Sequence, residues 1–261
     1  MHFLKHRAAR ELAASLIRVV KEIEWTMIAK MLQFIGDPTN TFWQHTIDTL
    51  KLSIVPIILA LLIGLSLGVL VARRPVAAFI SANLTGLMRA VPTLAVLFIM
   101  ILYFNQIGFL PSVVALTVLG IPPILLNTIA GLRGVDPSAI EAGQGMGMTQ
   151  QQVLFRVQIP LVLPVIAAGV RTASVQIIAT VPIAGLIGGG GYGDYILAGI
   201  NLLNIPQLLV GAVGIALLAL LAEFALAALQ RAVTPAGLRA TEPAAIAPSA
   251  RRSPVGSLAD V

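Results

Sequence analysis

The chain contains no cysteine, and only 11% of its 261 residues are charged. The absence of cysteine excludes disulfides and cysteine-ligated metal sites, and it leaves the redox compartment open. Soluble domains carry about 25% charged residues, so this composition argues against a soluble domain. Hydrophobic residues make up 57% of the chain, and the mean hydropathy is +0.93. The sequence therefore predicts an integral membrane protein.

Several kinds of site are also missing from the sequence. The three histidines, His2, His6 and His45, lack metal-ligand spacing, so we expect no metal site. A phosphate-cradling P-loop needs Gly, four residues and then Gly-Lys, but none of the lysines follows a glycine. No basic stretch with interleaved aromatic residues indicates nucleic-acid binding. The net charge of +6 is better explained by membrane topology and lipid headgroups.

Uncharged runs leave room for five membrane-spanning helices, because one such helix needs about 20 mostly apolar residues. The first run lies between Lys51 and Arg73. The 43 uncharged residues between Arg89 and Arg133 predict a tight pair of helices that is interrupted at 105–111. The fourth and fifth spans are predicted at about 160–187 and 205–229. We expect kinks or breaks at the prolines in and beside these spans, which are Pro56, Pro92, Pro122, Pro123, Pro164 and Pro182.

Lysines and arginines beside the spans predict the orientation, because cytoplasmic loops carry an excess of both. With five spans, the basic residues after the first, third and fifth spans fall on one side, which we expect to be cytoplasmic. The N-terminus then lies outside and the C-terminus inside. The basic residues of 1–30 oppose this rule. Residues 12–35 therefore form either an amphipathic helix in the interface, which we favour, or an extra inserted helix.

These features divide the chain into three regions. Residues 1–46 are predicted to be an N-terminal amphipathic or interfacial segment, and 47–231 an all-α transmembrane domain. The last region, 232–261, is rich in Ala, Pro, Ser and Arg without periodicity. We expect it to be a disordered cytoplasmic tail.

A polar stretch between the third and fourth spans has its own start and stop signals. Asp136, followed by proline, predicts the start of a short helix that ends at the sequence GMGM. Thr149 and Gln152 fit a capping box that starts a second short helix, and Pro160 opens the next span. The stretch 136–160 is thus predicted to be a helix-turn-helix elbow. It is either an ordinary amphipathic loop or a docking surface whose small residues let another backbone approach.

The elbow resembles the cytoplasmic signature of permease subunits of bacterial ATP-binding-cassette importers. That signature reads Glu-Ala-Ala, three residues, Gly, nine residues, Ile, one residue, Leu-Pro. This chain keeps the spacing from Glu141 through Gly147 to Pro160. Small or isosteric residues replace the usual ones at three positions, Gly143, Val157 and Ile159.

Further stretches between about 47 and 231 resemble the osmoprotectant branch of these permeases, which handles glycine betaine, choline and carnitine. They are LVARRP, NTIAGLRGVDPSAIEAGQGMGM, PVIAAGVRTA and IGGGGYGDYI. Leu126 departs from the branch, which often carries Arg at that position.

The resemblance implies a non-enzymatic transport subunit in the bacterial inner membrane. Its elbow would seat in a groove of a separate ATPase subunit, which would bind the ATP and Mg²⁺, so we expect no cofactor in this chain. Two permeases, identical or paralogous, would form the pore, and an extracytoplasmic binding protein would deliver the substrate. The ATPase-coupling residues would be Glu141, Ala142, Gly143, Gly145, Met146, Gly147 and Thr149.

The sequence GGGGYGD at 188–194 fits the GxGD pattern of intramembrane aspartyl proteases. That chemistry needs a second intramembrane aspartate, and no other aspartate falls in a predicted span. Two other interpretations compete with the protease. The glycines permit a turn that ends the fourth span, or the segment is an external loop where the binding protein meets Gly190, Gly191 and Asp194.

Two charged residues fall inside predicted spans. Arg171 lies about 16 Å along its helix from Pro160, and Glu223 about 12 Å from the cytoplasmic end of its own helix. These similar depths favour an ion pair, and a pore-lining role for Arg171 is the alternative. Further candidates for the translocation path are Asn127, Thr128, Thr180 and Pro182. Hydrogen bonds between packed helices explain them equally well.

Aromatic residues make up only 5% of the chain and are scattered along it. A cationic ligand such as a betaine is usually held in an aromatic cage, so we expect selectivity to reside in the separate binding protein. An amino-acid or methionine importer of the same architecture is the alternative function.

Overall fold

The computed structural model describes residues 25–233, and this part of the chain is built from helices and their connections. A helix over 25–36 comes first. It is followed by η1 (Pro38–Asn40), α2 (Phe42–Ala72), α3 (Pro75–Ala90), α4 (Thr93–Phe104), α5 (Phe109–Arg133), α6 (Pro137–Gly145), α7 (Gln150–Val153), the π-helical η2 (Leu154–Gln158), α8 (Ile159–Gly185), α9 (Tyr192–Asn201) and α10 (Ile205–Val233).

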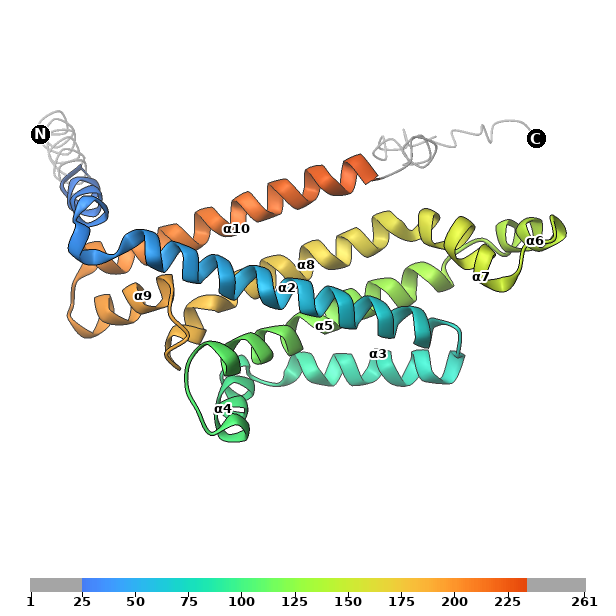
Figure 1. The fold of residues 1–261 in the computed structure, drawn as a ribbon, viewed down its shortest axis with the longest axis horizontal. Helices are drawn as coiled ribbons and strands as arrows, with labels where there is room; N and C mark the ends of the chain where they lie inside the picture. The colour runs from blue at the N-terminus through green and yellow to red at the C-terminus, as the bar shows by residue number, and fades with distance from the viewer. Residues whose placement is uncertain (1–24, 234–261) are drawn as a thin grey trace, which may run out of the picture.

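The long helices run roughly along one axis, and short helices lie at both ends (Figure 1). We call the end that carries α9 the α9 end, and the end that carries α6 and α7 the elbow end. Four helical stretches are long and apolar enough to cross a membrane, and the bent pair of α3 and α4 would make a fifth. The prediction of an all-α membrane protein with about five spans is confirmed.

Helix α5 lies at the centre of the bundle, because it packs against both α2 and α8 and is the most buried of the four spans. Small residues allow this close packing. A Cβ added to Gly68 of α2 would lie 2.6 Å from Cβ of Thr128 in α5, and one added to Gly120 would lie 2.6 Å from Cδ1 of Ile177 in α8. In lipid, helices associate through such van der Waals contact, because burying apolar groups brings no gain over lipid itself.

The second span differs from the prediction. A helix was expected only after Arg89, but α3 already begins at Pro75 and runs through Arg89. It then turns by 96° into α4. The 12 residues of α4 cover about 18 Å, which is short of the roughly 30 Å hydrocarbon core. Counting residues between charges failed because the helix does not end at its arginine.

The prolines in and beside the spans behave in two ways: one lies at a helix break, and the others lie within continuous helices. Pro92 separates α3 from α4, and the preceding residue Val91 has extended backbone, as residues before proline prefer. The other prolines do not break their helices. The prolines inside continuous helices are Pro56 in α2, Pro122 and Pro123 in α5, and Pro164 and Pro182 in α8.

The first span starts earlier than predicted. Helix α2 begins at Phe42, inside the region expected to be interfacial, and Lys51 forms an ion pair with Asp48 one turn before it, at 3.2 Å. The helix over 25–36 packs Met31 and Phe34 against the core and exposes Trp25. Most of the interfacial helix predicted over 12–35, and the predicted tail from residue 234 onward, lie outside the described residues.

Candidate functional site

The elbow begins with a capped short helix, as predicted. The Oδ1 atom of Asp136 accepts a hydrogen bond of 2.9 Å from the backbone N–H of Ser138, and a proline follows at the first helical position. This hydrogen bond holds the pKa of the Asp136 carboxyl below its ordinary value. Helix α6 ends at Gly145, and Gly147 has a φ of +82°, a conformation that glycine adopts at little cost.

The predicted capping box is present at the next helix. Gln152 N–H donates to Thr149 Oγ1 at 3.3 Å, and Thr149 N–H donates to Gln152 Oε1 at 2.8 Å. The prediction of a separate second short helix is wrong, however. The chain passes from α7 through the π-helical η2 into α8, so residues 150–185 form one continuous helical stretch. Pro160 does not interrupt this stretch: it lies in the first turn of α8, directly after the π-helical η2.

The predicted coupling residues do not all face the same way. Glu141, Ala142, Gly145, Met146, Gly147 and Thr149 are exposed, whereas Gly143 is buried against the elbow itself. A Cβ at Gly143 would lie 3.4 Å from Cγ2 of Val153, an ordinary contact, so the alanine of the family signature would fit there. Met146 and Phe155 are 70% and 64% exposed, which gives the elbow an apolar surface without a partner in the described chain.

The elbow end gathers the basic regions that the sequence predicted to share a side. The turn between α2 and α3 and the elbow lie there, and α10 runs toward this end but stops short of the elbow (Figure 1). A cavity of about 560 Å³ separates the α2–α3 turn from α7 and η2, with Arg73, Arg74, Gln151 and Phe155 among its lining residues. The elbow therefore stands clear of its neighbour on this side.

Arg171 of α8 and Glu223 of α10 form the predicted ion pair. The Nε of Arg171 donates to Oε1 of Glu223 at 2.6 Å, and Nη2 contacts the same oxygen. The side chains are 39% and 32% exposed. The interpretation of Arg171 as one half of a structural ion pair is confirmed, and its role in a translocation path stays a prediction.

The other residues assigned to the path lie in two places. Thr128 is fully buried at the contact between α5 and α2, and its hydroxyl donates to the Ile124 carbonyl at 2.8 Å. Asn127 donates to the Pro123 carbonyl of its own helix, also at 2.8 Å. Both hydrogen bonds stay within α5, so neither joins packed helices, and the role of these two residues in a path stays a prediction. Thr180 and Pro182 lie together near the α9 end of α8 and are at least partly exposed.

The glycine-rich segment at the α9 end is a turn that needs its glycines. Gly188, Gly190 and Gly191 have φ values of +70°, +88° and +77°. Gly191 also packs tightly against α2, because a Cβ there would lie 2.6 Å from Oγ1 of Thr49. The interpretation of this segment as a glycine-permitted turn is confirmed, and contact with a binding protein stays a prediction.

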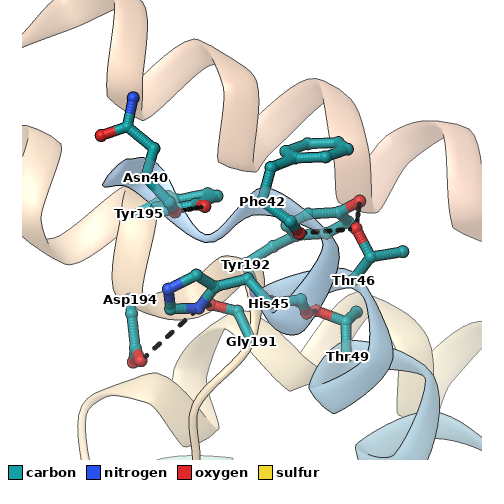
Figure 2. Close-up of polar contacts among 9 residues, drawn as sticks. All are labelled: Asn40, Phe42, His45, Thr46, Thr49, Gly191, Tyr192, Asp194 and Tyr195. Atoms are coloured by element: carbon teal, nitrogen blue, oxygen red, sulfur yellow. Dashed lines mark hydrogen bonds and ion pairs between the residues drawn. The ribbon is translucent and has the colours of Figure 1, made fainter. Parts of the chain in front are cut away.

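A polar network that the sequence did not reveal joins the start of α2 to α9 (Figure 2). Tyr192 N–H donates to Oγ1 of Thr49 at 2.8 Å, and the hydroxyls of Tyr192 and Thr46 share a hydrogen bond of 2.8 Å. Nδ1 of His45 lies 3.1 Å from the Gly191 carbonyl oxygen and 3.9 Å from Oδ2 of Asp194. The partners are about 145 residues apart, and no short motif links them.

Two groups in this network have raised pKa values. Burial raises the pKa of Asp194, nearby His45 opposes the shift, and the carboxylate of Asp48 adds to it. Burial, with a smaller contribution from Tyr192, raises the pKa of Tyr195 to about 12, and its hydroxyl donates to the Asn40 carbonyl. Asp194 therefore holds its proton more tightly than an ordinary surface aspartate.

Aromatic residues from distant parts of the sequence come together at this end. Phe34, Phe42, His45, Tyr192 and Tyr195 have neighbouring ring centroids 4.4–6.3 Å apart. Tyr192 and Tyr195 are only 6% and 4% exposed. The cluster therefore fastens α9 to α2 and does not form an open cage for a cation.

The geometry does not support the protease interpretation. Asp48 lies close enough to affect Asp194, so a second carboxylate is nearby, although the sequence did not indicate it. However, Asp194 lies in α9, a helix of ten residues that is not among the candidate spans of the described chain. Asp48 lies near the start of α2, so one of the two carboxylates belongs to a candidate spanning helix and the other does not, whereas intramembrane proteolysis would require both within spans.

Comparison with known proteins agrees with the resemblance at the elbow. The chain is 40% identical over 197 residues to the carnitine transport permease protein OpuCB of Listeria monocytogenes, covering 76% of this chain and 88% of that protein. It is 35% identical over 209 residues to the choline transport system permease protein OpuBB of Bacillus subtilis, covering 80% and 96%. It is 39% identical over 213 residues to the osmoprotectant import permease protein OsmW of Salmonella typhimurium, covering 80% and 97%.

Solved structures share the fold. A chain of the inward-facing MetNI methionine ABC transporter aligns with a TM-score of 0.68 and 24% identity, covering 77% of this chain and 100% of that one. Residues 60–236 match the family described as binding-protein-dependent transport system inner membrane component. The chain therefore belongs to this family of transport permeases.

Proposed function

We propose that the chain is the membrane-spanning subunit of an ATP-driven importer for small quaternary ammonium osmoprotectants such as glycine betaine, choline and carnitine. Its relatives named for carnitine, choline and osmoprotectants are 35–40% identical over at least three quarters of the chain. That breadth of similarity includes the spans as well as the elbow. It supports the same substrate class for this chain.

The single observation that carries the coupling role is the elbow. It projects from the end of the bundle, is capped at both of its helix starts, and exposes Met146 and Phe155. An exposed apolar pair on a rigid projection suits a groove in a soluble subunit. We assign that subunit as a separate ATPase, which binds ATP and Mg²⁺ and transmits closure to α8 through the continuous stretch 150–185.

The arrangement of the ends supports an orientation. Arginines concentrate at the elbow end, so this end faces the cytoplasm, along with the C-terminal end of α10. The α9 end, with Asp194 beside the glycine turn, then faces outward, where a substrate-binding protein docks. A second permease, either a copy or a paralogue, completes the pore.

A methionine or amino-acid importer is the second candidate. The solved MetNI chain is 24% identical to this chain, which supports a shared fold but not a shared substrate. The curated relatives are more similar and are named for quaternary amines, so we favour osmoprotectants.

The test is transport by the whole complex. The permease is purified together with its ATPase and reconstituted into proteoliposomes. ATP is supplied on the side of the membrane that carries the ATPase, and the binding protein is added on the other side. Uptake of radiolabelled glycine betaine, choline, carnitine and methionine is then measured. We expect uptake of at least one quaternary amine that requires both ATP and the binding protein.

Controls separate the outcomes. Non-hydrolysable ATP analogues should abolish uptake, and excess unlabelled methionine should not compete with it. Uptake of methionine alone would overturn the substrate class. Uptake of a quaternary amine that is indifferent to ATP would overturn the coupling role.

A further inference from the structure

A small cavity lies beside the break in the second span. It measures about 210 Å³ and is lined by residues of α3, α4, α5 and α8 and by the connection between α3 and α4. Among the described residues that line it, Gln176 alone carries an amide, and the rest are aliphatic side chains, a proline and Met88. The volume is enough for several water molecules or for one small solute.

The break itself explains why the cavity is there. Helices α3 and α4 meet at 96°, and Val91 between them has extended backbone. Pro92 has no N–H, so it cannot continue the hydrogen bonding of α3, although Val91 N–H still donates to the Met88 carbonyl at 3.4 Å. In a membrane, irregular backbone of this kind is tolerated where it lines a cavity and not where it faces lipid.

Gln176 brings an unpaired polar group to the same place. It is exposed on α8, nine residues before the helix ends at Gly185, which is about 14 Å along the axis. Its amide has no hydrogen-bond partner among the residues 25–233 that the structure describes. Leaving an amide unpaired in hydrocarbon costs free energy, so this side chain faces water or a polar solute.

Polar neighbours extend this face of α8 without adding charge. Thr172 and Thr180 lie one turn on either side of Gln176, and their hydroxyls donate to the carbonyls of Ala168 at 3.0 Å and Gln176 at 2.7 Å. Because the hydroxyl hydrogens are used within the helix, the oxygen lone pairs are what remain for a passing solute. The adjacent charge of Arg171 is paired with Glu223 of α10.

We propose that this cavity is a transit subsite for the quaternary ammonium group of the substrate, an inference that rests on the proposed function. A quaternary ammonium has no N–H and carries its charge on methyl groups, so it packs against aliphatic walls and the polarisable sulfur of Met88. The amide oxygen of Gln176 faces the positive methyl groups, and the amide N–H₂ donates to a carboxylate or hydroxyl of the substrate. The described residues that line the cavity carry no formal charge, which keeps binding weak enough for release.

The experiment measures selectivity of the reconstituted complex for choline, which is cationic, against glycine betaine, which is zwitterionic. Gln176→Glu adds a carboxylate to the cavity, so the ratio of the KM for glycine betaine to the KM for choline is expected to rise about tenfold. Met88→Glu adds a carboxylate from α3 and should shift the ratio in the same direction. Gln176→Leu removes the amide and should raise the KM for both solutes about fivefold.

Matched controls use Gln33, which is exposed on the helix over 25–36 and does not line the cavity. Gln33→Glu and Gln33→Leu make the same chemical changes and should leave both KM values unchanged. The affinity of the isolated binding protein is measured separately, and copurification with the ATPase checks assembly of each variant.

The outcomes distinguish the two proposals. If the unaltered complex transports none of glycine betaine, choline and carnitine, the proposed function is overturned. The second case is a complex that transports both solutes but whose KM ratio is the same in Gln176→Glu, Met88→Glu and the Gln33 variants. That result overturns the subsite and leaves the proposed function standing. A shift of the ratio in both cavity variants supports the subsite, because a purely structural role would not favour the cation over the zwitterion.

Discussion

Arg171 and Glu223 join α8 to α10 through two contacts to one carboxylate oxygen, one of them a hydrogen bond of 2.6 Å from Nε. Both residues lie within stretches that are long and apolar enough to span a membrane. An isolated charge at such a depth is costly, and each residue removes that cost for the other. Gln230 adds a second link, because its Nε2 donates to the Pro164 carbonyl of α8 at 3.1 Å.

Replacing one partner of this ion pair should destabilise the protein more than replacing both. Arg171→Met or Glu223→Met alone leaves one uncompensated charge, and the partly exposed pair leads us to expect a loss of about 1–3 kcal/mol. The double variant should recover most of that loss, since no charge is then stranded. Thermal unfolding of the purified protein in detergent, read as Tm, measures all three. Additive losses in the double variant would contradict the pairing.

Gly68 should not tolerate even a methyl group. A Cβ there would lie 2.6 Å from Cβ of Thr128 on a fully buried face, so Gly68→Ala must push α2 away from α5. We expect a loss of about 1–3 kcal/mol and a lower yield of folded protein. Gly86→Ala is the matched control, because Gly86 is in α3 with no atom within 4 Å and alanine favours helix by up to about 1 kcal/mol. Equal yields of the two variants would contradict the close contact.

Gly147→Leu should uncouple transport from ATP hydrolysis. The residue is exposed and has a φ of +82°, so leucine strains the turn between α6 and α7 by about 1–2 kcal/mol and adds bulk to the elbow surface. We expect loss of substrate-stimulated ATP hydrolysis in the assembled complex while membrane insertion persists. Gly143→Ala serves as the control, because a Cβ fits there and coupling should be kept. Full coupling in Gly147→Leu would count against the proposed role of the elbow.

The capping box should hold the first turn of the long helical stretch 150–185. Thr149→Ala removes the oxygen that accepts from Gln152 N–H, at a cost of about 1 kcal/mol. Hydrogen exchange of the amides in α7 should then speed up about fivefold, since their opening becomes easier by that amount. Thr149→Ser keeps the oxygen and should preserve the slow exchange. Unchanged exchange in Thr149→Ala would show that the cap adds nothing to the packing of the elbow.

Asp194 should respond in opposite directions to its two charged neighbours. Burial raises its pKa, His45 lowers it and Asp48 raises it, so His45→Gln should raise the pKa further and Asp48→Asn should lower it. Infrared titration of the carboxyl measures both shifts. A shift of the same sign in both variants would contradict the placement of these two groups beside Asp194.

Asp194 should also make the free energy of unfolding depend on pH, with its contribution falling as the pH rises. Folding raises the pKa of Asp194, so its protonated form favours the folded state below the ordinary aspartate pKa. That contribution is lost as the pH rises through the higher pKa of the folded state. Asp194→Asn should flatten this part of the stability curve, and an unchanged curve would mean that Asp194 does not contribute to it.

Much of the fold was open to prediction because its signals are local. The spans follow from long apolar runs, which leave the chain no other way to satisfy its backbone in lipid. The caps at Asp136 and Thr149, the end of α6 before Gly147 and the glycine turn at 188–191 each depend on a few neighbouring residues. The ion pair was predictable because helix rise converts residue number into depth.

Tertiary structure decided what depends on contacts between distant segments. Whether Arg89 ends a helix, whether Thr128 faces a path or is buried against Gly68, and whether Gln176 points into a cavity all depend on how α2, α3, α5 and α8 pack. The network of His45, Thr49 and Tyr192 is likewise invisible in the sequence, because its partners are more than 140 residues apart. Sequence alone determined which long segments are apolar and where the helix caps at Asp136 and Thr149 and the glycine turn lie. Only the packing of those helices determined which polar groups pair with each other and which remain exposed, because in a membrane an unpaired polar group is stable only where the fold gives it a partner or water.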